Sequence, residues 1–316
     1  MDGKRVILVA AVAALAAAHA CGGDDGGRAD VVDTGTDGDA SGACRTHSDC
    51  PGGYCMEGTP RVCEPLPVVF GDMSCLRNNP PPTPGVGEVT VTAHIEDFED
   101  DTPVAGAVAE LFFDGVVDET PDMVLDPTNA AGDVPGVAGI PRDRFIAYRV
   151  RGGRLPSGVT IKTTIEYDQE TPVADGGRLT LLSVSDRTYR LIQTVLGIRP
   201  TPTRGVLAGE FQDCNGDPVE GVIVRLVDAA GRDCNDINDR ECYYRYFDEE
   251  YPARLENQPH SSADGLYGAV EVPPGEWTIE ILGRLSATTE VELLGTKRIL
   301  ATADAIAIAN VGPLAE

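Results

Sequence analysis

The chain has 316 residues, and its 51 acidic and 25 basic side chains give a formal net charge of −26. Because like charges repel at long range, this charge argues against nucleic acid and anionic lipid headgroups as partners. The length is sufficient for two ordinary domains and a small module after a leader. Since Asp and Glu are scattered along the mature chain, we attribute the acidity to solubility.

The first twenty residues have the pattern of an export signal. Lys4 and Arg5 precede an almost unbroken apolar run over residues 6–18, which matches the core of a signal peptide. A membrane span needs about 20 residues, and no other stretch of the chain approaches that length in apolar residues. We therefore predict a signal peptide over 1–20 and a location outside the cytoplasm for everything that follows.

Cys21 is predicted to carry a lipid. The run Ala18-His19-Ala20-Cys21 resembles the lipobox of bacterial lipoproteins, in which the cysteine is acylated and becomes the first mature residue. Gly22 stands where such lipoproteins carry an acidic residue when they stay in the inner membrane. The resemblance therefore implies an outer-membrane anchor, on the periplasmic side or the cell surface. Plain secretion is the alternative, because residues 18–20 also fit an ordinary cleavage site.

Two segments follow that cannot form a core of their own. Residues 21–43 contain Gly, Asp, Ala and Thr with no aromatic side chain, so we predict a disordered acidic tether. Residues 44–75 hold five cysteines whose spacing does not fit paired zinc ligands, and oxidation outside the cytoplasm predicts disulfides there. Residues 48–55 resemble small cysteine-rich modules of myxobacterial surface lipoproteins.

The rest of the chain is predicted to contain two related units. A Pro-rich linker at 76–87 and a second Pro-rich joint near 200 delimit units at 88–199 and 203–316. Within them, residues 101–111 correspond to 216–226 and residues 140–150 to 272–281. The distance between these matches grows from 115 to 132 residues, which places an insertion in the second unit at 232–260.

Each unit is predicted to be an antiparallel β-sandwich. Apolar and polar residues alternate with a period of two over 222–227 and 277–281, and Asp-Pro and Pro-Gly pairs mark turns between short strands. One short helix is expected at about 186–196, capped by Asp186. For residues 301–309, strand and helix both remain open. We predict an all-β fold with two tandem immunoglobulin-like or prealbumin-like sandwiches after the cysteine-rich module and tether.

The second unit resembles the carboxypeptidase regulatory-like domain, which is a prealbumin-type sandwich. The resemblance is carried by the turn at 213–221, by Ala263-Asp264-Gly265-Leu266-Tyr267, and by Val272-Pro273-Pro274-Gly275-Glu276-Trp277. The first unit departs from the pattern at Asp143, where the family has glycine. The family implies a domain that supports other activities without being catalytic.

The cysteine count predicts a bridge between distant parts of the chain. Nine cysteines are odd, and acylation of Cys21 would leave eight that can pair. Five of the eight precede the first sandwich and three lie in the second, so complete pairing needs one bridge between these regions, with Cys75 as the favoured upstream partner. The disulfide candidates are Cys44, Cys50, Cys55, Cys63, Cys75, Cys214, Cys234 and Cys242.

A search for catalytic chemistry returns weak patterns, so no catalytic residues and no enzyme are predicted. His94 and Glu96 could ligate zinc from one face of a strand, but no third ligand is near in the sequence. His260 is only adjacent to the pair at 261–262. Calcium is the one cofactor considered: Asp213, Asn215 and Asp217 have the opening spacing of a calcium loop. Pro218 and Val224 then break that frame, which favours a polar turn.

The insertion is rich in aromatic residues, and two interpretations of it stay open. It could form a recognition surface for a protein or polysaccharide, or it could cover the edge of the sandwich. The function predicted is that of a non-catalytic, lipid-anchored envelope or cell-surface protein with a binding or spacer role. The alternative is a secreted metal-dependent hydrolase or a calcium-binding adhesin-like protein. The candidate partner-binding residues are Tyr243, Tyr244, Tyr246, Phe247 and Tyr251.

Overall fold

Strands are the main secondary structure of the described residues, which confirms the all-β fold class. The computed structural model describes residues 44, 49–50, 53–56, 62–78, 83, 85–195, 198, 201–236, 240–248, 251–253 and 258–314. The predicted signal peptide, Cys21 and the tether lie outside these residues. Among the residues described, α2 is the only α-helix, and no helix is long and apolar enough to cross a membrane.

Two short strands precede the sandwiches, β1 (Gly53–Met56) and β2 (Val62–Pro65). The first sandwich contains β3 (Glu88–Asp97), β4 (Ala105–Phe112), β5 (Met123–Val124), β6 (Asp133–Pro141), β7 (Phe145–Arg154), β8 (Thr163–Glu170) and β9 (Arg178–Ser183), and it is followed by α2 (Asp186–Val195). The second sandwich contains β10 (Gly205–Glu210), β11 (Ile223–Val227), β12 (Tyr243–Asp248), β13 (Tyr251–Ala253), β14 (Leu266–Val272), β15 (Gly275–Gly283), β16 (Glu292–Ala301) and β17 (Ala305–Ile308).

The two sandwiches share one topology. In the first, the strand orders are β6-β3-β9 and β8-β7-β4; in the second they are β14-β10-β17 and β16-β15-β11. The pairs β3–β9 and β10–β17 are parallel, and the other pairs within these three-strand sets are antiparallel. The sandwiches differ in the strands added to these three-strand sets. In the first, β5 pairs with β4, whereas in the second the β12–β13 hairpin pairs with β14. The repeat seen in the sequence is therefore a repeat of fold.

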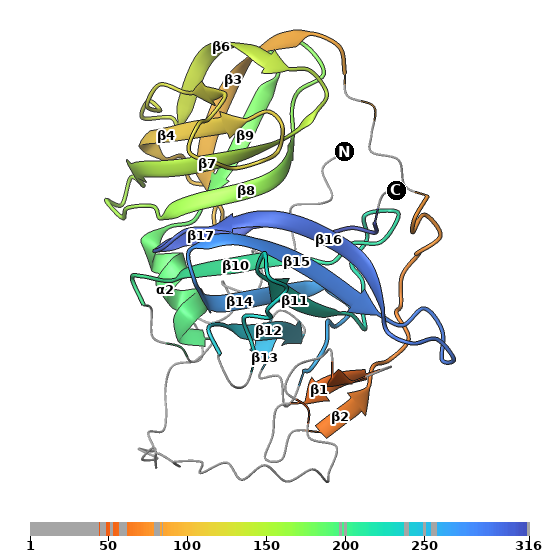
Figure 1. Ribbon diagram of the computed structural model, residues 1–316. Helices are drawn as coiled ribbons and strands as arrows, with labels where there is room; N and C mark the ends of the chain where they lie inside the picture. Colours follow the sequence, from red (N-terminus) through yellow and green to blue (C-terminus); the bar gives the residue numbers. More distant parts are fainter. Residues whose placement is uncertain are drawn as a thin grey trace, which may run out of the picture.

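The sandwiches are joined by β17, which lies between β10 of the second and β8 of the first and is parallel to both (Figure 1). The result is one nine-stranded sheet, with the order β13-β12-β14-β10-β17-β8-β7-β4-β5. Both faces of β17 are buried: Ala307 faces the core of the second sandwich, and Ile306 lies in the cluster that contains Tyr189 of α2. A strand buried on both faces is apolar throughout, which is why the pattern at 301–309 left strand and helix open.

Charged side chains add to this joint. The Nζ atom of Lys162, the residue just before β8, lies 2.8 Å from Asp304 and 3.1 Å from Asp186, so it links the start of β8 to the turn before β17 and to the helix. Lys297 on β16 pairs with Asp168 on β8, and burial lowers the pKa of Lys297 to about 8. Ion pairs and strand pairing thus hold the two sandwiches together across the same boundary.

Tyrosine hydroxyl groups satisfy backbone amides on two edge strands. The N–H of Leu182 on β9 donates to the hydroxyl of Tyr148, and the N–H of Leu300 on β16 donates to that of Tyr167, each at 2.7 Å. Unpaired edge amides are templates for unwanted strand addition. The tyrosines protect both strands, and Tyr167 does so across the joint.

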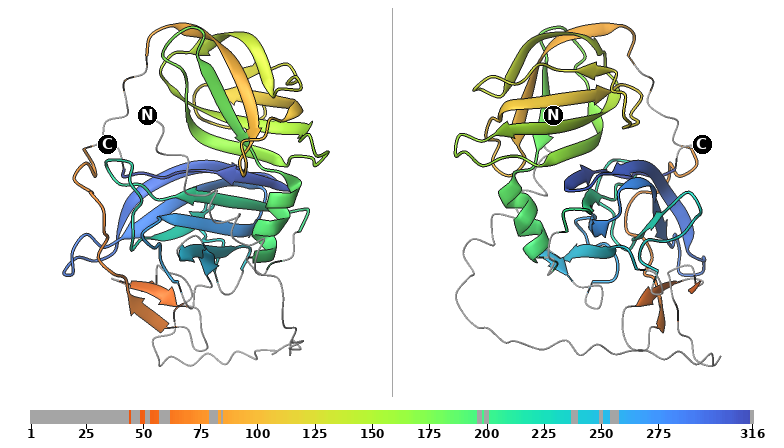
Figure 2. Two further views of the ribbon diagram at one scale, coloured as in Figure 1. Left: turned by 180° about the vertical axis from the view of Figure 1, so that it is seen from behind. Right: turned by 60° about the vertical axis from the view of Figure 1, so that its left-hand side comes forward.

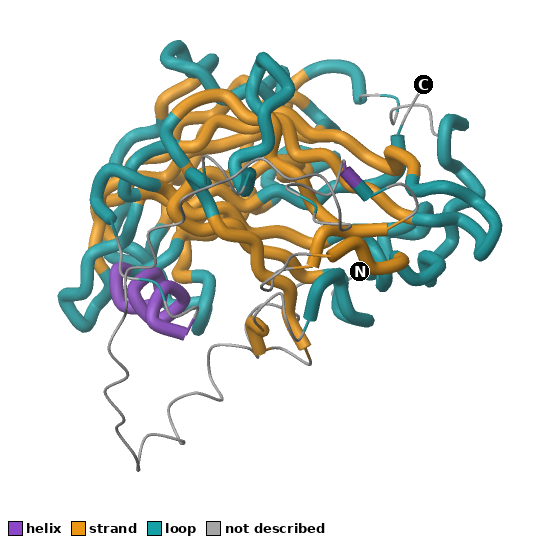
Figure 3. Tube along the Cα trace, turned by 60° about the horizontal axis from the view of Figure 1, so that its bottom comes forward, coloured by secondary structure: helices purple, strands orange, loops and turns teal. Residues whose placement is uncertain are grey.

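Helix α2 forms a third layer on the outer face of the second sandwich, and Figure 3 shows it at the side of the strand layers. Tyr189 belongs to a buried cluster with Val206, Val270 and Ile306. The cap differs from the prediction: the N–H of Thr188 donates to Ser185 Oγ at 3.1 Å. Ser185 is therefore the N-cap, and Asp186 pairs with Lys162 instead.

The last part of the predicted cysteine-rich module, from residue 66 on, packs on the second sandwich instead of on the β1–β2 hairpin, although the first sandwich follows it in sequence. Val68 and Phe70 form β-bridges with Arg284 and Glu220, and the N–H of Arg77 donates to the carbonyl of Leu314. Figures 1 and 2 show this orange segment alongside the second sandwich. The predicted linker at 76–87 thus begins with residues that are bound to the folded body.

All eight cysteines in the described residues are bonded in pairs. Two bridges lie within the N-terminal module, one within the insertion, and one joins the N-terminal segment to the second sandwich, with Cys75 as its upstream member. The pairs are Cys44–Cys55, Cys50–Cys63, Cys75–Cys214 and Cys234–Cys242.

Candidate functional site

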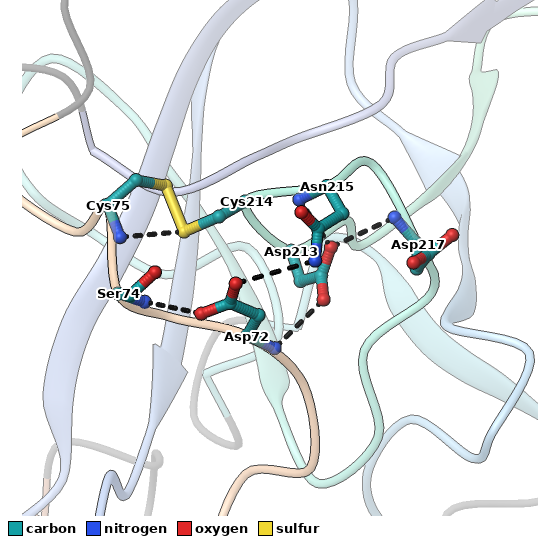
Figure 4. Close-up of a disulfide and its surroundings, with 7 residues drawn as sticks. All are labelled: Asp72, Ser74, Cys75, Asp213, Cys214, Asn215 and Asp217. Carbon is teal, nitrogen blue, oxygen red and sulfur yellow. Dashed lines mark hydrogen bonds between the residues drawn. A yellow bond between two sulfur atoms is a disulfide. The ribbon is translucent and has the colours of Figure 1, made fainter.

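The predicted calcium residues lie beside the Cys75–Cys214 disulfide, where the N-terminal segment meets the second sandwich (Figure 4). Asp213 is buried, and each of its carboxylate oxygens accepts backbone hydrogen bonds. Oδ2 accepts from the N–H of Asp72 at 2.8 Å, and Oδ1 accepts from the N–H groups of Asn215 at 2.8 Å and Asp217 at 3.0 Å. This carboxylate fastens the turn at 213–217 to the N-terminal segment.

Asp72 completes the contact from the other side. Its Oδ1 accepts from the N–H of Ser74 at 2.9 Å, and its carbonyl accepts from the N–H of Cys214 at 2.9 Å. Hydrogen bonds from Ser74 lower the pKa of Asp72. Burial opposes ionisation of Asp213, but the amides of Asp72, Asp217 and Asn215 outweigh it and lower its pKa as well. Both carboxylates are therefore held in the charged form.

This geometry matches the polar turn that the sequence favoured over a calcium loop. Asp213 already accepts three backbone bonds, while Asn215 and Asp217 are exposed. Among the described residues, the only three His, Cys, Asp or Glu ligand atoms that lie within 4.8 Å of one another belong to Cys44, Cys50 and Cys63. Those sulfur atoms are in disulfides. Calcium at Asp213 stays a prediction.

Replacing Asp213 with Ala should lower the free energy of unfolding by about 1–3 kcal/mol at pH 7, because buried amides lose their acceptor. Folding lowers the pKa of Asp213. The ionised carboxylate therefore stabilises the folded protein at pH values above the ordinary pKa of an aspartate, and this stabilisation is lost as the pH falls below about 4. The difference between wild type and Asp213→Ala should therefore shrink in urea titrations at pH 3. The exposed Asp217→Ala is the matched control, and an equal loss in both variants would contradict this role.

His94 lies beside a second carboxylate in addition to Glu96, and the sequence could not reveal it. Its Nδ1 lies 2.7 Å from Asp133 on β6, and its Nε2 lies 3.1 Å from Glu96. The two carboxylates contact opposite nitrogens of one buried ring, so the three side chains do not converge on a common point. The arrangement ties β3 to β6. Asp133 is 39 residues away in sequence, and only strand pairing brings it close.

The pair at His260 and Ser261 does not form a nucleophile and base. Ser261 is buried, its Oγ donates to the carbonyl of Val219 at 2.8 Å, and it accepts from the N–H of Val222 at 3.1 Å. His260 Nδ1 lies 3.0 Å from the Ser261 carbonyl, not from its hydroxyl. Both groups serve backbone hydrogen bonding.

The aromatic residues of the insertion divide between the core and the surface. Tyr244 and Tyr246 are fully buried, and their hydroxyls accept from the N–H groups of Leu226 and Val224 on β11, each at 2.7 Å. For these two tyrosines the prediction of a partner surface is wrong, because alternation along β12 turns them inward to seal the β11 edge.

Two of the predicted partner residues keep partial exposure. Tyr243 and Phe247 lie on the other face of β12, and the guanidinium groups of Arg240 and Arg245 lie 5.3 Å and 6.0 Å from the centre of the Tyr243 ring. The side chain of Tyr251 lies outside the described residues. What remains of the predicted surface is Tyr243 and Phe247 with the neighbouring arginines.

Asp72 is the residue of this site that sequence reasoning missed. It lies 141 residues from Asp213, in a segment that the sequence pattern assigns to the end of the cysteine-rich module. The only available signal was the argument that Cys75 pairs with a cysteine of the second unit, since such a bridge brings Asp72 beside Asp213.

Comparisons with known proteins identify no family for this chain. No family model and no curated protein matches the chain. Among solved structures, a minor pilin of Streptococcus agalactiae, GBS52, aligns over 72% of this chain and 96% of its own, with 10% identity and a TM-score of 0.22. Shaft pilin SpaA of Lactobacillus rhamnosus GG aligns over 73% and 98%, with 10% identity and a TM-score of 0.21.

A third structure, the Bacillus anthracis TIE protein, aligns over 72% of this chain with 12% identity and a TM-score of 0.21. This chain spans only 34% of the length of that protein.

Proposed function

We propose that this chain is an exported, non-catalytic envelope or surface protein that holds a rigid pair of β-sandwiches on a lipid anchor at Cys21. The observation that supports it best is the attachment of residues 66–78 to the second sandwich by the Cys75–Cys214 disulfide, two β-bridges and the Asp72–Asp213 contact. A mechanical force applied through the N-terminal tether would therefore act on the second sandwich at this attachment.

The four disulfides support a location in an oxidising compartment, and the outer membrane is the location proposed. Because the described segment 66–78 is fastened to the second sandwich, we propose that this sandwich lies nearer the anchor and the first sandwich farther from it. The joint at β17 would make the pair a spacer of fixed geometry. A protein or polysaccharide ligand is proposed for the surface at Tyr243 and Phe247, where an aromatic ring lies beside two guanidinium groups.

Intact mass spectrometry of the mature protein, purified from membranes without reduction, tests the anchor and the compartment together. We expect a mass that begins at Cys21 with attached acyl groups and eight cysteines in disulfides. Cys21→Ser should leave the protein soluble and unacylated. An unprocessed chain with reduced thiols would contradict the proposal, and an unacylated chain cleaved before Cys21 would reduce it to plain secretion.

The binding surface is tested by Tyr243→Ala combined with Phe247→Ala, which should abolish retention on cell-wall material while the protein stays folded; its unfolding midpoint should fall, because Tyr243 also packs against the cluster that contains Tyr189. Deletion of the whole insertion is unsuitable, because it would also remove the tyrosines that seal β11. The control is Phe145→Ala, which truncates an exposed aromatic side chain of the first sandwich. Equal retention of the double variant and wild type would contradict a ligand at this surface.

A further inference from the structure

Residues 97–99, at the end of β3 and just after it, contact the segment that runs from the end of β9 into the first turn of α2. The N–H of Phe98 donates to the carbonyl of Ser183 at 2.7 Å, and Asp97 Oδ1 accepts from the N–H of Ser185 at 2.9 Å. Glu99 Oε2 accepts from the hydroxyl of Thr188 at 2.5 Å. Asp97 and Glu99 are thus bonded to the N-cap and the first turn of α2, and Phe98 is bonded to the end of β9 just before them.

This contact bears on the joint between the sandwiches, because α2 packs on the second sandwich. Tyr189 lies in the cluster formed with Val206, Val270 and Ile306, and Phe98 packs against the same cluster. The loop therefore holds the helix on one side while the helix covers β10, β14 and β17 on the other.

The charges around Asp97 are all of one sign. Its carboxylate is buried, and the charged groups that face it are Glu99 and Asp100 of its own loop. Helix α2 contributes the N–H of Ser185 and, next to Glu99, the hydroxyl of Thr188. Within the described part of the chain no cation pairs with Asp97. Ionisation thus places a buried negative charge beside two others.

We propose that the contact between residues 97–99 and the first turn of α2 is an acid-tightened latch, closed when Asp97 is neutral and loosened when it ionises. Protonation removes the repulsion with Glu99 and Asp100, and the remaining carbonyl oxygen still accepts a hydrogen bond. Loosening frees the first turn of the helix without breaking the β8–β17 pairing.

The direction of the effect agrees with the titration of the group. Burial, with the neighbouring charge of Asp100, raises the pKa of Asp97 to about 6, although the amides of Glu99 and Ser185 oppose the shift. A carboxyl whose pKa is raised by folding favours the folded contact when protonated. Protonated Asp97 therefore stabilises the contact with α2 fully below about pH 4, and this stabilisation is lost as the pH rises through 6.

Hydrogen exchange of the amides of α2, corrected for intrinsic rates, tests the latch in the intact protein. Protection of the first turn should fall about tenfold between pH 5 and pH 7.5, as the shift from about 4 to about 6 requires. Asp97→Asn should keep high protection at both values. Asp100→Asn should move the midpoint to lower pH, because it removes one neighbouring charge.

Asp101→Asn is the matched control, since Asp101 is exposed in the same loop, and it should behave like wild type. Equal protection of wild type at both pH values would overturn the proposal. So would an Asp97→Asn variant that keeps the pH dependence. If Asp97→Asn fails to fold, an unchanged midpoint in Asp100→Asn overturns the proposal in its place.

Discussion

Replacing both Cys75 and Cys214 with Ser should lower the free energy of unfolding of the second sandwich by about 3–5 kcal/mol. The bridge spans 139 residues, and a cross-link over so long a loop strongly restricts the unfolded chain. Urea titration followed by Trp277 fluorescence measures the loss, because Trp277 packs in the core of the second sandwich. Limited proteolysis should cut residues 62–78 faster in the variant.

The matched control is Cys44→Ser with Cys55→Ser, which removes a bridge that spans only 11 residues within the N-terminal module. This control should leave the unfolding midpoint of the sandwiches unchanged. The same midpoint in wild type and in the Cys75 and Cys214 variant would contradict the view that this bridge fastens the tether segment to the body.

Ile306→Asp should have the second large effect, because it places an unpaired carboxylate in the buried cluster beneath α2. The expected loss is about 3–5 kcal/mol, typical of an uncompensated buried charge. Since β17 joins the two sheets, the variant should also lose the single cooperative unfolding transition. Calorimetry should then show two transitions, and the radius of gyration from X-ray scattering should increase.

Val124→Asp controls for the added charge, because Val124 is exposed on the short edge strand β5. It should unfold like wild type. A single transition at the wild-type temperature for Ile306→Asp would show that β17 does not hold the sandwiches together.

The sequence was sufficient for the features that depend on local pattern. Alternation and turn residues predicted the sandwiches, and two matched segments predicted the repeat that β4 with β11 and β7 with β15 display. An odd number of cysteines on each side predicted a long-range bridge and favoured Cys75, which is bonded to Cys214.

The features that sequence missed depend on the other sheet or on a distant segment. The alternation of Ala and Ile at 305–308 could not show that β17, which pairs with β10 on one edge, would pair with β8 of the first sandwich on its other edge. Aromatic density in the insertion could not show which rings face inward, because that depends on the register of β12 against β14. Asp72 and Asp133 reach their partners through pairings across 141 and 39 residues.

The most direct test of the account is the distance between the two sandwiches in solution. Spin labels attached through non-cysteine chemistry at Thr90 on β3 and Thr296 on β16, both exposed, report this distance by pulsed electron paramagnetic resonance at pH 5. A rigid body joined at β17 predicts one narrow distance distribution that broadens in Ile306→Asp. A broad or two-peaked distribution in the wild-type protein would contradict the fixed joint.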